Sequence, residues 1–317
     1  MKKLTIALLS GGISSEREVS LNSGNQVFEA LDMGKYDVIR YDPKTDLQKL
    51  VADAERIDAA LILLHGPYGE DGTVQGLFDL LDIPYQGSGV LGSAVAMNKL
   101  VAKQLYSQAG IPIPPYLVLN REDSLNTADV VARLGASLVI KPVAGGSSVG
   151  MSIIKSEDLL QDAVETAFKY DRSVLIERFI DGIELTGGVI GNDHPEGLPL
   201  IEIVPGENFD FFDYEAKYTP GATQEICPAR IDDALTAKAQ TYAVAAHQAL
   251  ACKGYSRTDM ILRGQDIYVL ETNTIPGMTA TSLFPQAAAA AGLPFGRLMD
   301  RLIELSIEEH AAGNTGA

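Results

Sequence analysis

The sequence contains no tryptophan and only two cysteines, Cys227 and Cys252, among 317 residues. Two cysteines cannot build a disulfide framework in a chain of this size, and no paired-ligand spacing for zinc is present. We therefore expect reduced thiols and a cytoplasmic location. The apolar run at residues 4–9 is shorter than the core of a normal secretion signal, so it indicates a first buried strand. No apolar run approaches the length of a membrane span.

Basic residues are also scarce, with 25 Lys and Arg against 42 Asp and Glu, which gives a net charge of −17. This balance excludes binding to nucleic acid or to an anionic membrane through bulk charge. An anionic ligand would need a few well-placed cations. The apolar fraction of 46% is ordinary for a globular enzyme. The length alone favours about two domains.

Strand and helix patterns alternate along the first third of the chain, which predicts a parallel sheet covered by helices. Ser15 and Glu18 are spaced as a capping box at the start of the first helix. A second unit combines three strands, a Gly/Ser loop at 145–150 and a helix, and the last third adds strands, an irregular stretch, a hairpin and two helices. The predicted strands are 4–9, 36–41, 59–64, 138–141, 151–154, 174–177, 186–190 and 200–204, and the helices 18–31, 47–55, 92–109, 157–170, 232–252 and 294–309. We expect a frayed tail after Ala311.

Three polar side chains mark the ends of two short apolar strands near the C-terminus. Asp259 heads one strand, and Glu271 and Asn273 end the next, projecting from the same face because side chains alternate along a strand. If the strands pair as a hairpin through Gly264, Asp259 lies near both. Two carboxylates and an amide oxygen suit Mg²⁺. The alternative is ordinary solvated acids.

Two glycine-containing strings could contact phosphates, and no Walker A pattern exists. Residues 87–92 match G-x-G-x-x-G but lack the N-terminal βαβ position and an acid for the ribose, so they are weak evidence for a dinucleotide site. In the second string, Lys141 ends an apolar strand before a loop containing Ser147 and Ser148. Backbone N–H groups and hydroxyls of such a loop can surround phosphate oxygens, although a flexible turn also favours glycine. Lys99 is a possible second cation.

Several longer motifs occur in one order from Leu9 to about Ile307, and together they resemble the D-alanine–D-alanine ligase family of the ATP-grasp superfamily. The motifs are Gly11-Gly12-Ile13-Ser14-Ser15-Glu16-Arg17-Glu18-Val19-Ser20, His65-Gly66-Pro67-Tyr68-Gly69-Glu70-Asp71-Gly72, residues 145–151, Asp213-Tyr214-Glu215-Ala216-Lys217-Tyr218, and Glu271-Thr272-Asn273-Thr274-Ile275-Pro276-Gly277-Met278-Thr279.

The resemblance implies an α/β (α+β) fold of three domains, with an N-terminal parallel-sheet domain at 1–96 and ATP held between a central domain at 97–184 and a C-terminal domain at 185–310. A tail at 311–317 would follow. The long irregular segment at 205–221 has aromatic anchors, with glycines and prolines near its ends, and this composition predicts a lid. The alternative is a surface loop with a self-packed aromatic cluster. ATP and D-alanine would be the substrates, two Mg²⁺ ions (or Mn²⁺) the metals, and a homodimer the assembly.

The resemblance also implies a role for each matching residue. Lys99, Lys141 and Ser148 would contact the phosphates of ATP. The adenosine would contact Glu177, Glu184, Phe179 and Ile180. The metals would be held by Asp259, Glu271 and Asn273. Glu16, Ser147 and Tyr218 would form a network at the first substrate, and Arg257 with the Gly277 N–H would stabilise the oxyanion. The second substrate would contact Ser282, Lys217 and Leu283, with His65 nearby.

The implied reaction activates one D-alanine as an acylphosphate, which the amine of a second D-alanine attacks. Tyr218 favours an amine nucleophile over D-lactate, whereas D-serine remains an alternative second substrate. A nucleotide or amino-acid sensor on the same fold and, more weakly, a nicotinamide dehydrogenase are the rival functions.

Overall fold

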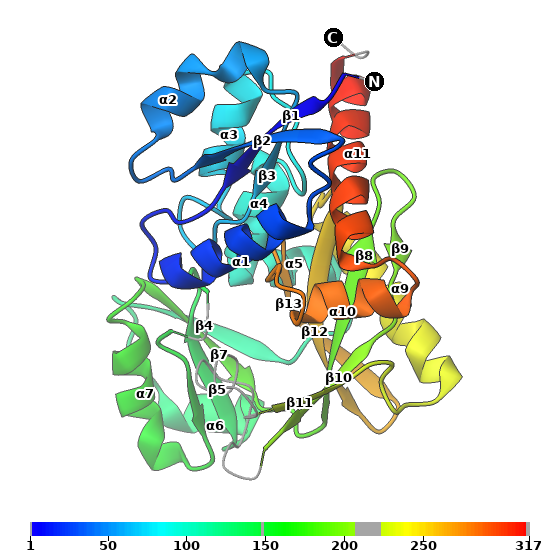
Figure 1. Cartoon of the computed structure of the whole chain (residues 1–317). Helices are drawn as coiled ribbons and strands as arrows, with labels where there is room; N and C mark the ends of the chain where they lie inside the picture. The colour runs from blue at the N-terminus through cyan, green and yellow to red at the C-terminus, as the bar shows by residue number, and fades with distance from the viewer. Residues whose placement is uncertain (1, 147–148, 207–222, 315–317) are drawn as a thin grey trace.

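The computed structural model describes residues 2–146, 149–206 and 223–314. Ser147, Ser148, Lys217, Tyr218 and residues 207–221 of the predicted lid lie outside the described residues. Three sheets organise the rest, and they occupy the top, the lower left and the lower right of Figure 1.

The first sheet is parallel, as predicted, with the order β2-β1-β3. Its strands are β1 (Leu4–Leu9), β2 (Tyr36–Tyr41) and β3 (Ala59–Ile62). The central strand β1 is almost wholly apolar and its last four residues are buried, as expected for a strand covered on both faces. The elements between and after these strands are α1 (Arg17–Ala30), α2 (Leu47–Ala52), a 3₁₀ turn at Ala54–Arg56 and α3 (Thr73–Leu80).

The predicted capping box is wrong. Helix α1 begins at Arg17 with Glu16 at its N-cap, and no side chain caps it. The preceding loop is tied down instead by Arg17, which donates to the Gly12 carbonyl at 2.7 Å and to Asp42 at 2.5 Å. This pairing positions the loop that carries Glu16.

The single helix predicted at 92–109 is two helices, α4 (Val90–Met97) and α5 (Lys99–Gln108). Asn98 adopts an extended conformation between them, and its side chain accepts a hydrogen bond from the Val101 N–H. Asparagine at an N-cap stabilises a new helix start in this way. The Lys99 N–H also donates to the Val143 carbonyl at 2.9 Å, which fixes the start of α5 against the central sheet.

The central sheet is antiparallel with the order β4-β7-β5-β6. Its strands are β4 (Tyr116–Asn120), β5 (Leu138–Pro142), β6 (Ser152–Ile154) and β7 (Ser173–Arg178). Helices α6 (Thr127–Leu134) and α7 (Leu160–Ala167), the latter preceded by a 3₁₀ turn at Glu157–Leu159, pack their apolar residues against it in one core. The opposite face is left for the site described below.

The third sheet is antiparallel and has the order β11-β10-β8-β12-β13, with β9 paired to β8. Its strands are β8 (Ile183–Ile190), β9 (Glu196–Gly197), β10 (Ile201–Pro205), β11 (Thr223–Ile226), β12 (Tyr255–Arg263) and β13 (Asp266–Asn273). Helix α9 (Asp233–Ala249) and the apolar side of α5 share a core with it. The hairpin predicted through Gly264 is confirmed as β12 and β13.

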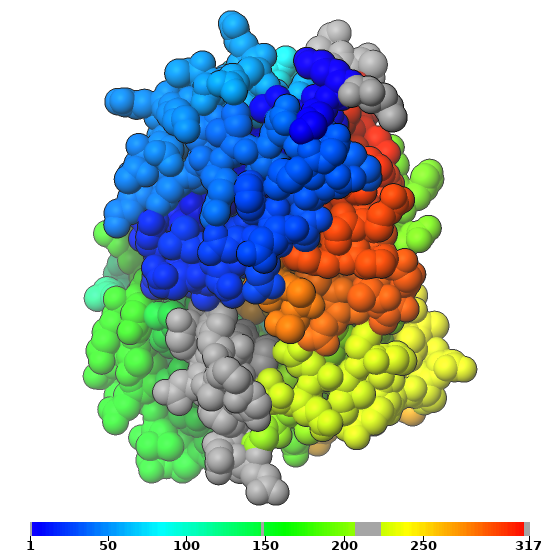
Figure 2. Space-filling model, in the orientation of Figure 1, coloured from blue at the N-terminus to red at the C-terminus, as the bar shows by residue number. Residues whose placement is uncertain are grey.

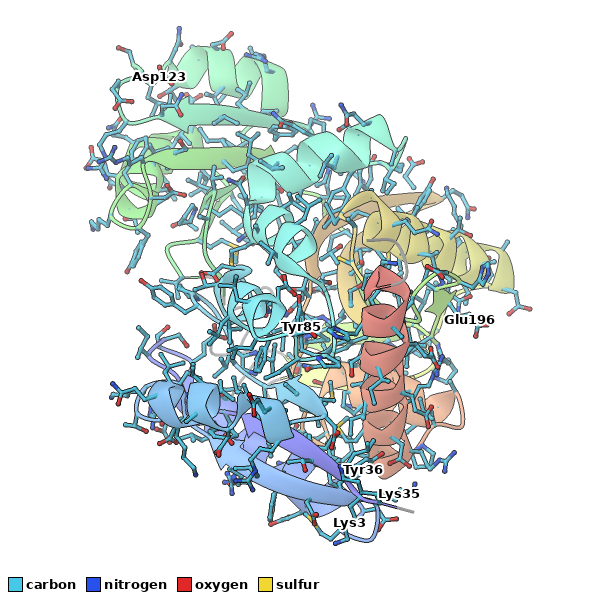
Figure 3. The ribbon with its side chains drawn as sticks, turned by 90° about the horizontal axis from the view of Figure 1, so that it is seen from above. Lys3, Lys35, Tyr36, Tyr85, Asp123 and Glu196 are labelled. Atoms are coloured by element: carbon cyan, nitrogen blue, oxygen red, sulfur yellow. The ribbon has the colours of Figure 1, made fainter. Side chains whose placement is uncertain are left out.

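The last two helices, α10 (Leu283–Ala290) and α11 (Phe295–Asn314), return to the first sheet. Asp300 of α11 accepts hydrogen bonds from Tyr36 (2.8 Å) and Lys35 (2.7 Å), which lie beside this helix in Figure 3. The blue N-terminal and orange-red C-terminal surfaces accordingly adjoin in Figure 2. The frayed tail predicted after Ala311 is wrong for residues 312–314, which continue α11. No helix in the described ranges is long and apolar enough to cross a membrane.

Candidate active site

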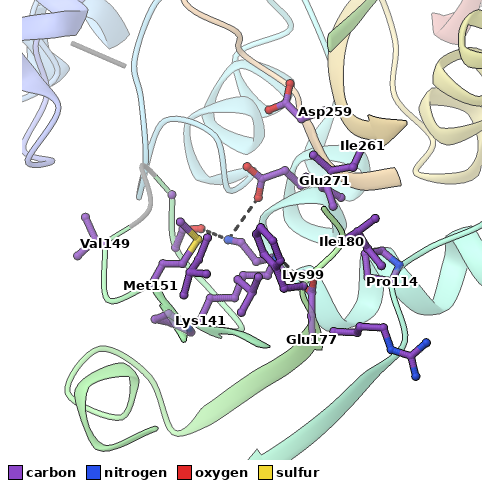
Figure 4. Close-up of a pocket in the computed structure, with 18 of the residues that line it drawn as sticks. Lys99, Pro114, Lys141, Val149, Met151, Glu177, Ile180, Asp259, Ile261 and Glu271 are labelled. Carbon is purple, nitrogen blue, oxygen red and sulfur yellow. Dashed lines mark hydrogen bonds and ion pairs between the residues drawn. The ribbon is translucent and has the colours of Figure 1, made fainter. Parts of the chain in front are cut away.

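A cavity lies between the central sheet and the hairpin of the third sheet (Figure 4). One wall comes from β5, β6, β7 and the loop after β5, and the other from β8, β12 and β13. The described lining residues are Lys99, Pro114, Val139, Lys141, Pro142, Ala144, Gly145, Gly146, Val149, Met151, Ile153, Glu177, Arg178, Phe179, Ile180, Glu184, Asp259, Ile261, Leu270 and Glu271.

The hairpin register brings the predicted acidic residues together. Asp259 stands directly opposite Glu271, and Arg257 opposite Asn273. A bulge follows, because Met260 pairs with Val269 and leaves Leu270 unpaired. A bulge suspends the strict alternation of side chains, so Leu270 and Glu271 both line the cavity although they are neighbours in sequence.

Asp259 is held in place by two neighbours. Arg257 donates to it through Nε (2.9 Å) and Nη2 (2.8 Å), and the Thr186 hydroxyl donates to Oδ1 at 2.6 Å. Burial lowers the pKa of Arg257, but the charge of Asp259 and its hydrogen bonds, together with the charges of Glu271 and Glu70, outweigh burial and raise the pKa overall. Arg257 is therefore a permanent cation beside this carboxylate. Asn273 is fixed as well, since its Oδ1 accepts from the Ile275 N–H at 3.0 Å.

Lys99 lies between the two walls. Its ammonium group donates to the Gly145 carbonyl and lies 3.8 Å from Glu271 Oε2 (dashed lines in Figure 4). The first residue of α5 thus connects the glycine loop to the hairpin. A cation in this position can meet a phosphate held between the two walls.

Glu177 and Lys141 meet at the base of the cavity. Lys141 Nζ lies 3.0 Å from Glu177 Oε1, and both side chains are almost fully buried. A second lysine, Lys103, approaches the same oxygen at 3.1 Å. Burial by itself would raise the pKa of Glu177, but the charges of Lys103 and Lys141 bring it below its ordinary value. Glu177 is therefore an anion.

Apolar side chains line the cavity on both sides of these charges. Val139, Met151 and Ile153 face it from the central sheet, and Ile261 and Leu270 from the hairpin. The predicted residues Phe179, Ile180 and Glu184 line it too. A flat aromatic ring fits between two apolar walls, and acids at their edge can accept hydrogen bonds from it or from a sugar.

Glu16 and His65 are both buried on the side of the first sheet, and the charge of Glu16 acts on His65. The Glu16 Oε2 atom lies 3.2 Å from the position that a Cβ on Gly66 would take and 3.9 Å from that on Gly146. Glu16 therefore faces the glycine loop immediately before Ser147. Burial lowers the pKa of His65, while the nearby charge of Glu16 opposes this effect.

Glu70 was not predicted as a site residue. Its Oε2 accepts a hydrogen bond from the Gly66 N–H at 2.6 Å. Burial raises its pKa to about 8, and the charges of Glu16 and Glu271 add to this effect. The residue belongs to the predicted motif at 65–72, but sequence alone does not show which acid of a turn points inward.

The third group of predicted residues surrounds the start of α10. A Cβ on Gly277 would lie 3.1 Å from Ser282 Oγ, so these two residues adjoin. The Ser282 hydroxyl accepts from the Thr279 N–H at 3.1 Å. Leu283 packs in the core shared by the first sheet and α11. The roles predicted for Ser147, Ser148, Lys217 and Tyr218 concern residues that are not described.

The glycine string at 87–92 has a packing role. A Cβ on Gly92 would lie 2.7 Å from the Ala251 carbonyl oxygen, and one on Gly87 would lie 3.1 Å from the Tyr255 ring. The contact at Gly92 leaves no room for a Cβ, and the one at Gly87 is tighter than most Cβ contacts, so these glycines allow close packing against Ala251 and Tyr255.

The site as a whole combines two lysines and an arginine with paired carboxylates at one end of an apolar cavity. Within the described ranges, no three His, Cys, Asp or Glu side chains gather into a metal site. Two carboxylates and an amide would hold Mg²⁺ together with phosphate oxygens, since this ion is commonly bound through one or two carboxylates plus substrate phosphates. The arrangement is suited to phosphoryl transfer from a nucleotide.

Comparison with known proteins supports this interpretation of the geometry. Residues 105–304 match the family model described as D-ala D-ala ligase C-terminus, and residues 42–88 match that for the N-terminus. The D-alanine–D-alanine ligase of Syntrophobacter fumaroxidans is 65% identical over 308 residues, covering 97% of this chain and 99% of that protein.

Two solved structures have the same fold. The D-alanine–D-alanine ligase of Bacillus anthracis in complex with ATP matches with a TM-score of 0.86 and 35% identity, covering 98% of this chain and 99% of that one. The VanG D-Ala:D-Ser ligase of Enterococcus faecalis matches with a TM-score of 0.82 and 33% identity, covering 96% and 100%. With both family models in order and a relative matched from end to end, the chain belongs to the D-alanine–D-alanine ligase family.

Proposed function

We propose that the protein joins two molecules of D-alanine into D-alanyl-D-alanine at the expense of ATP, releasing ADP and phosphate, for peptidoglycan precursor synthesis. The observation that carries this proposal is the cavity in which Lys99 and Lys141 face the Asp259–Glu271 pair of the hairpin. It occurs in a chain that matches D-alanine–D-alanine ligases along nearly its full length.

The adenosine of ATP would occupy the apolar part of the cavity, between Met151 and Ile153 on one wall and Leu270 on the other. Glu177 and Glu184 would accept hydrogen bonds from it, and Phe179 and Ile180 would pack against its base. The phosphates would extend toward Lys99 and Lys141. Cations on this path favour the triphosphate despite the acidic character of the whole chain.

The hairpin residues fit a divalent cation, because Asp259 and Glu271 are opposite in register and Asn273 supplies an amide oxygen. They would hold two Mg²⁺ ions, or Mn²⁺. When bound, these ions neutralise charge on the transferring phosphoryl group.

In the first step, a carboxylate oxygen of one D-alanine attacks the γ-phosphorus of ATP, and the bond to the ADP oxygen breaks. Lys99 and Lys141 neutralise negative charge during this transfer. Glu16 would hold the ammonium group of this D-alanine, and His65 would lie beside it. The product is an acylphosphate, which must be kept from water.

In the second step, the amine of another D-alanine attacks the acylphosphate carbon, forming the C–N bond. The tetrahedral intermediate places negative charge on oxygen, which Arg257 and the Gly277 N–H would stabilise. Collapse breaks the bond to phosphate, and the nitrogen loses its proton. Ser282 would hold the second carboxylate beside Leu283. Ser147, Ser148, Lys217 and Tyr218 keep the roles predicted from the resemblance.

The test is to incubate the protein with ATP, Mg²⁺ and D-alanine and to measure phosphate and dipeptide together. We expect equal amounts of both. Mixtures of D-alanine with D-serine or D-lactate test the alternative second substrates, of which D-serine gains weight from the likeness to VanG. A sensor would produce neither phosphate nor dipeptide, and that result would overturn the proposal.

We also propose that the chain forms a homodimer and acts in the cytoplasm, where ATP is available. The two free cysteines are compatible with that compartment. The three separate sheets support a division into domains at 1–96, 97–184 and 185–310.

A further inference from the structure

Lys103 is a fully buried cation that the reaction described above does not use. It lies on α5 one helical turn after Lys99, and its side chain is 0% exposed. Residues four apart lie on the same face of a helix. Lys99 lines the cavity, whereas Lys103 is not among the described residues that do so.

The ammonium group of Lys103 shares one oxygen atom with that of Lys141. Lys103 Nζ lies 3.1 Å and Lys141 Nζ 3.0 Å from Glu177 Oε1. Lys103 Nζ also lies 5.9 Å from the centre of the Tyr116 ring. Tyr116 is the cross-strand partner of Glu177, so ring and carboxylate enclose the lysine together.

The charges of this cluster do not cancel. One carboxylate neutralises one ammonium group, and Lys103 and Lys141 together leave a surplus of one positive charge. Lys141 is the member of the pair that lines the cavity. The net positive charge of the cluster therefore lies on the side of the cavity, where the phosphates of ATP would bind. Without Lys103, Glu177 and Lys141 would form a neutral pair.

We propose that Lys103 is a positioning residue for ATP. It forms an ion pair with Glu177 on the side away from the cavity, and this pairing leaves the positive charge of Lys141 available to the phosphates. This inference rests on the proposed function. Lys103 does not touch the substrate; it acts through Glu177 and Lys141. Burying an ammonium group costs free energy, and here that cost maintains a positive charge at the base of the nucleotide cavity.

The first test is the K103M variant, which keeps a long side chain without its charge. We expect the KM for ATP to rise roughly tenfold, about 1.4 kcal/mol, while the KM for D-alanine changes less than about twofold. The matched control is K49M, because Lys49 also lies over a tyrosine ring, 5.3 Å from that of Tyr41, but outside the cavity. An unchanged KM for ATP in folded K103M would overturn the inference.

The second test uses pH and the K103R variant. Burial lowers the pKa of Lys103 to about 8. The charged groups that face it are Glu177 on β7, Lys141 on β5 and Glu271 on β13, and the Tyr116 ring lies on β4. The positive charge is present below this pKa and is lost as the pH rises through it. The wild-type KM for ATP should therefore rise above about pH 8.

K103R should not show this rise, because a guanidinium group stays charged. A matching rise in K103R, or a flat wild-type profile, contradicts the inference even if K103M does not fold. Binding of ATP, measured by calorimetry without D-alanine, keeps the inference separate from the proposed function. A wild-type protein that binds ATP with this pH dependence but makes no dipeptide refutes only the function.

Discussion

Asp259 and Arg257 illustrate how single side chains define the chemistry of this site. The guanidinium group makes two hydrogen bonds to the carboxylate, and Thr186 adds a third. The cation proposed to stabilise the oxyanion and the acid proposed to bind metal thus hold each other in position. A bidentate pair restricts both partners more than a single contact does.

Replacing Glu271 by Gln tests the proposed metal site by exchanging one carboxylate oxygen for an amide nitrogen. The change removes a negative charge opposite Asp259 and preserves the shape of the side chain. We expect phosphate and dipeptide formation to fall by about 10²-fold or more, the effect typical of losing one strong electrostatic contact in a transition state. Thermal unfolding should show an intact fold.

The matched control for this change is Glu196→Gln, an exposed acid at the far side of the third sheet (Figure 3). It should retain wild-type activity. Wild-type turnover and Mg²⁺ dependence in the Glu271 variant would exclude Glu271 as a metal ligand.

The raised pKa of Glu70 predicts that the stability of the fold depends on pH. Its pKa is about 8 in the folded protein because of burial, against an ordinary value of 4.5. The stability that depends on its protonated form is present below about pH 4.5 and is lost as the pH rises through about 8. Glu70→Gln cannot ionise and should lose less stability on going from about pH 5 to 8.5.

The measurement for Glu70 is the melting temperature of variant and wild type at both pH values. The difference between the two proteins should shift in favour of the variant at the higher pH. Glu122→Gln, at an exposed position, serves as the control and should follow wild type throughout. A difference independent of pH would show that Glu70 ionises normally.

Among the elements, α5 contacts both walls of the cavity. Lys99 bridges the glycine loop and Glu271, Lys103 pairs with Glu177, and Tyr106 donates a hydrogen bond to Thr272 at 2.8 Å. Thr272 in turn contacts the Thr258 hydroxyl at 3.0 Å. One helix therefore positions a cation, a buried ion pair and both strands of the acidic hairpin.

Tyr106→Phe tests the connection between α5 and the hairpin. The tyrosine is fully buried, so the change removes one hydrogen bond and leaves Thr272 with fewer partners. We expect a loss of about 1–3 kcal/mol of stability, measured by urea-induced unfolding. Tyr85→Phe removes an exposed hydrogen bond to Asp79 and should cost less than about 0.5 kcal/mol. Equal costs would show that the buried connection adds nothing.

The sequence predicted the strands of this fold better than its helices. Apolar runs such as 4–9 and the hairpin strands are short, bounded by turns and largely buried, so their pattern is clear. Helices α3, α6 and α10 were not predicted, and neither were strands β4, β9 and β11. Helices α3 and α10 begin without a side-chain cap at Gly72 and Ser282, whereas α6 is capped by the Asn126 side chain, which accepts from the Asp129 N–H at 3.1 Å.

Tertiary contacts explain what sequence patterns could not show in the site. The Asn98 break in the predicted helix 92–109 depends on pairing of its backbone with the central sheet. Lys103 looks like any solvated helix lysine until β7 places Glu177 beside it. Likewise Leu270 faces the cavity only because of a bulge. By contrast, the hairpin acids could be predicted from strand alternation and one turn.

For the whole molecule, we expect a homodimer with twice the 33.9 kDa mass of the chain. Large leucines exposed on α3 and α4, Leu80 (88%) and Leu91 (66%), are candidates for the interface. Sedimentation analysis at micromolar concentration should give the doubled mass, and Leu80→Asp with Leu91→Asp should lower it to that of one chain. Val51→Asp on α2 is the control. A wild-type protein sedimenting as a single chain would contradict this expectation.

The packing of α11 against the first sheet affects how the protein is made. Leu298, Met299, Leu302 and Ile303 share one core with Ile6 and Leu8. During translation at about 5–20 residues per second, the N-terminal strands leave the ribosome roughly 10–60 seconds before that helix exists. Until then the nascent sheet lacks part of its cover. We therefore expect chaperones to bind the growing chain while this apolar surface is exposed. A chain that terminates before α11 should aggregate for the same reason.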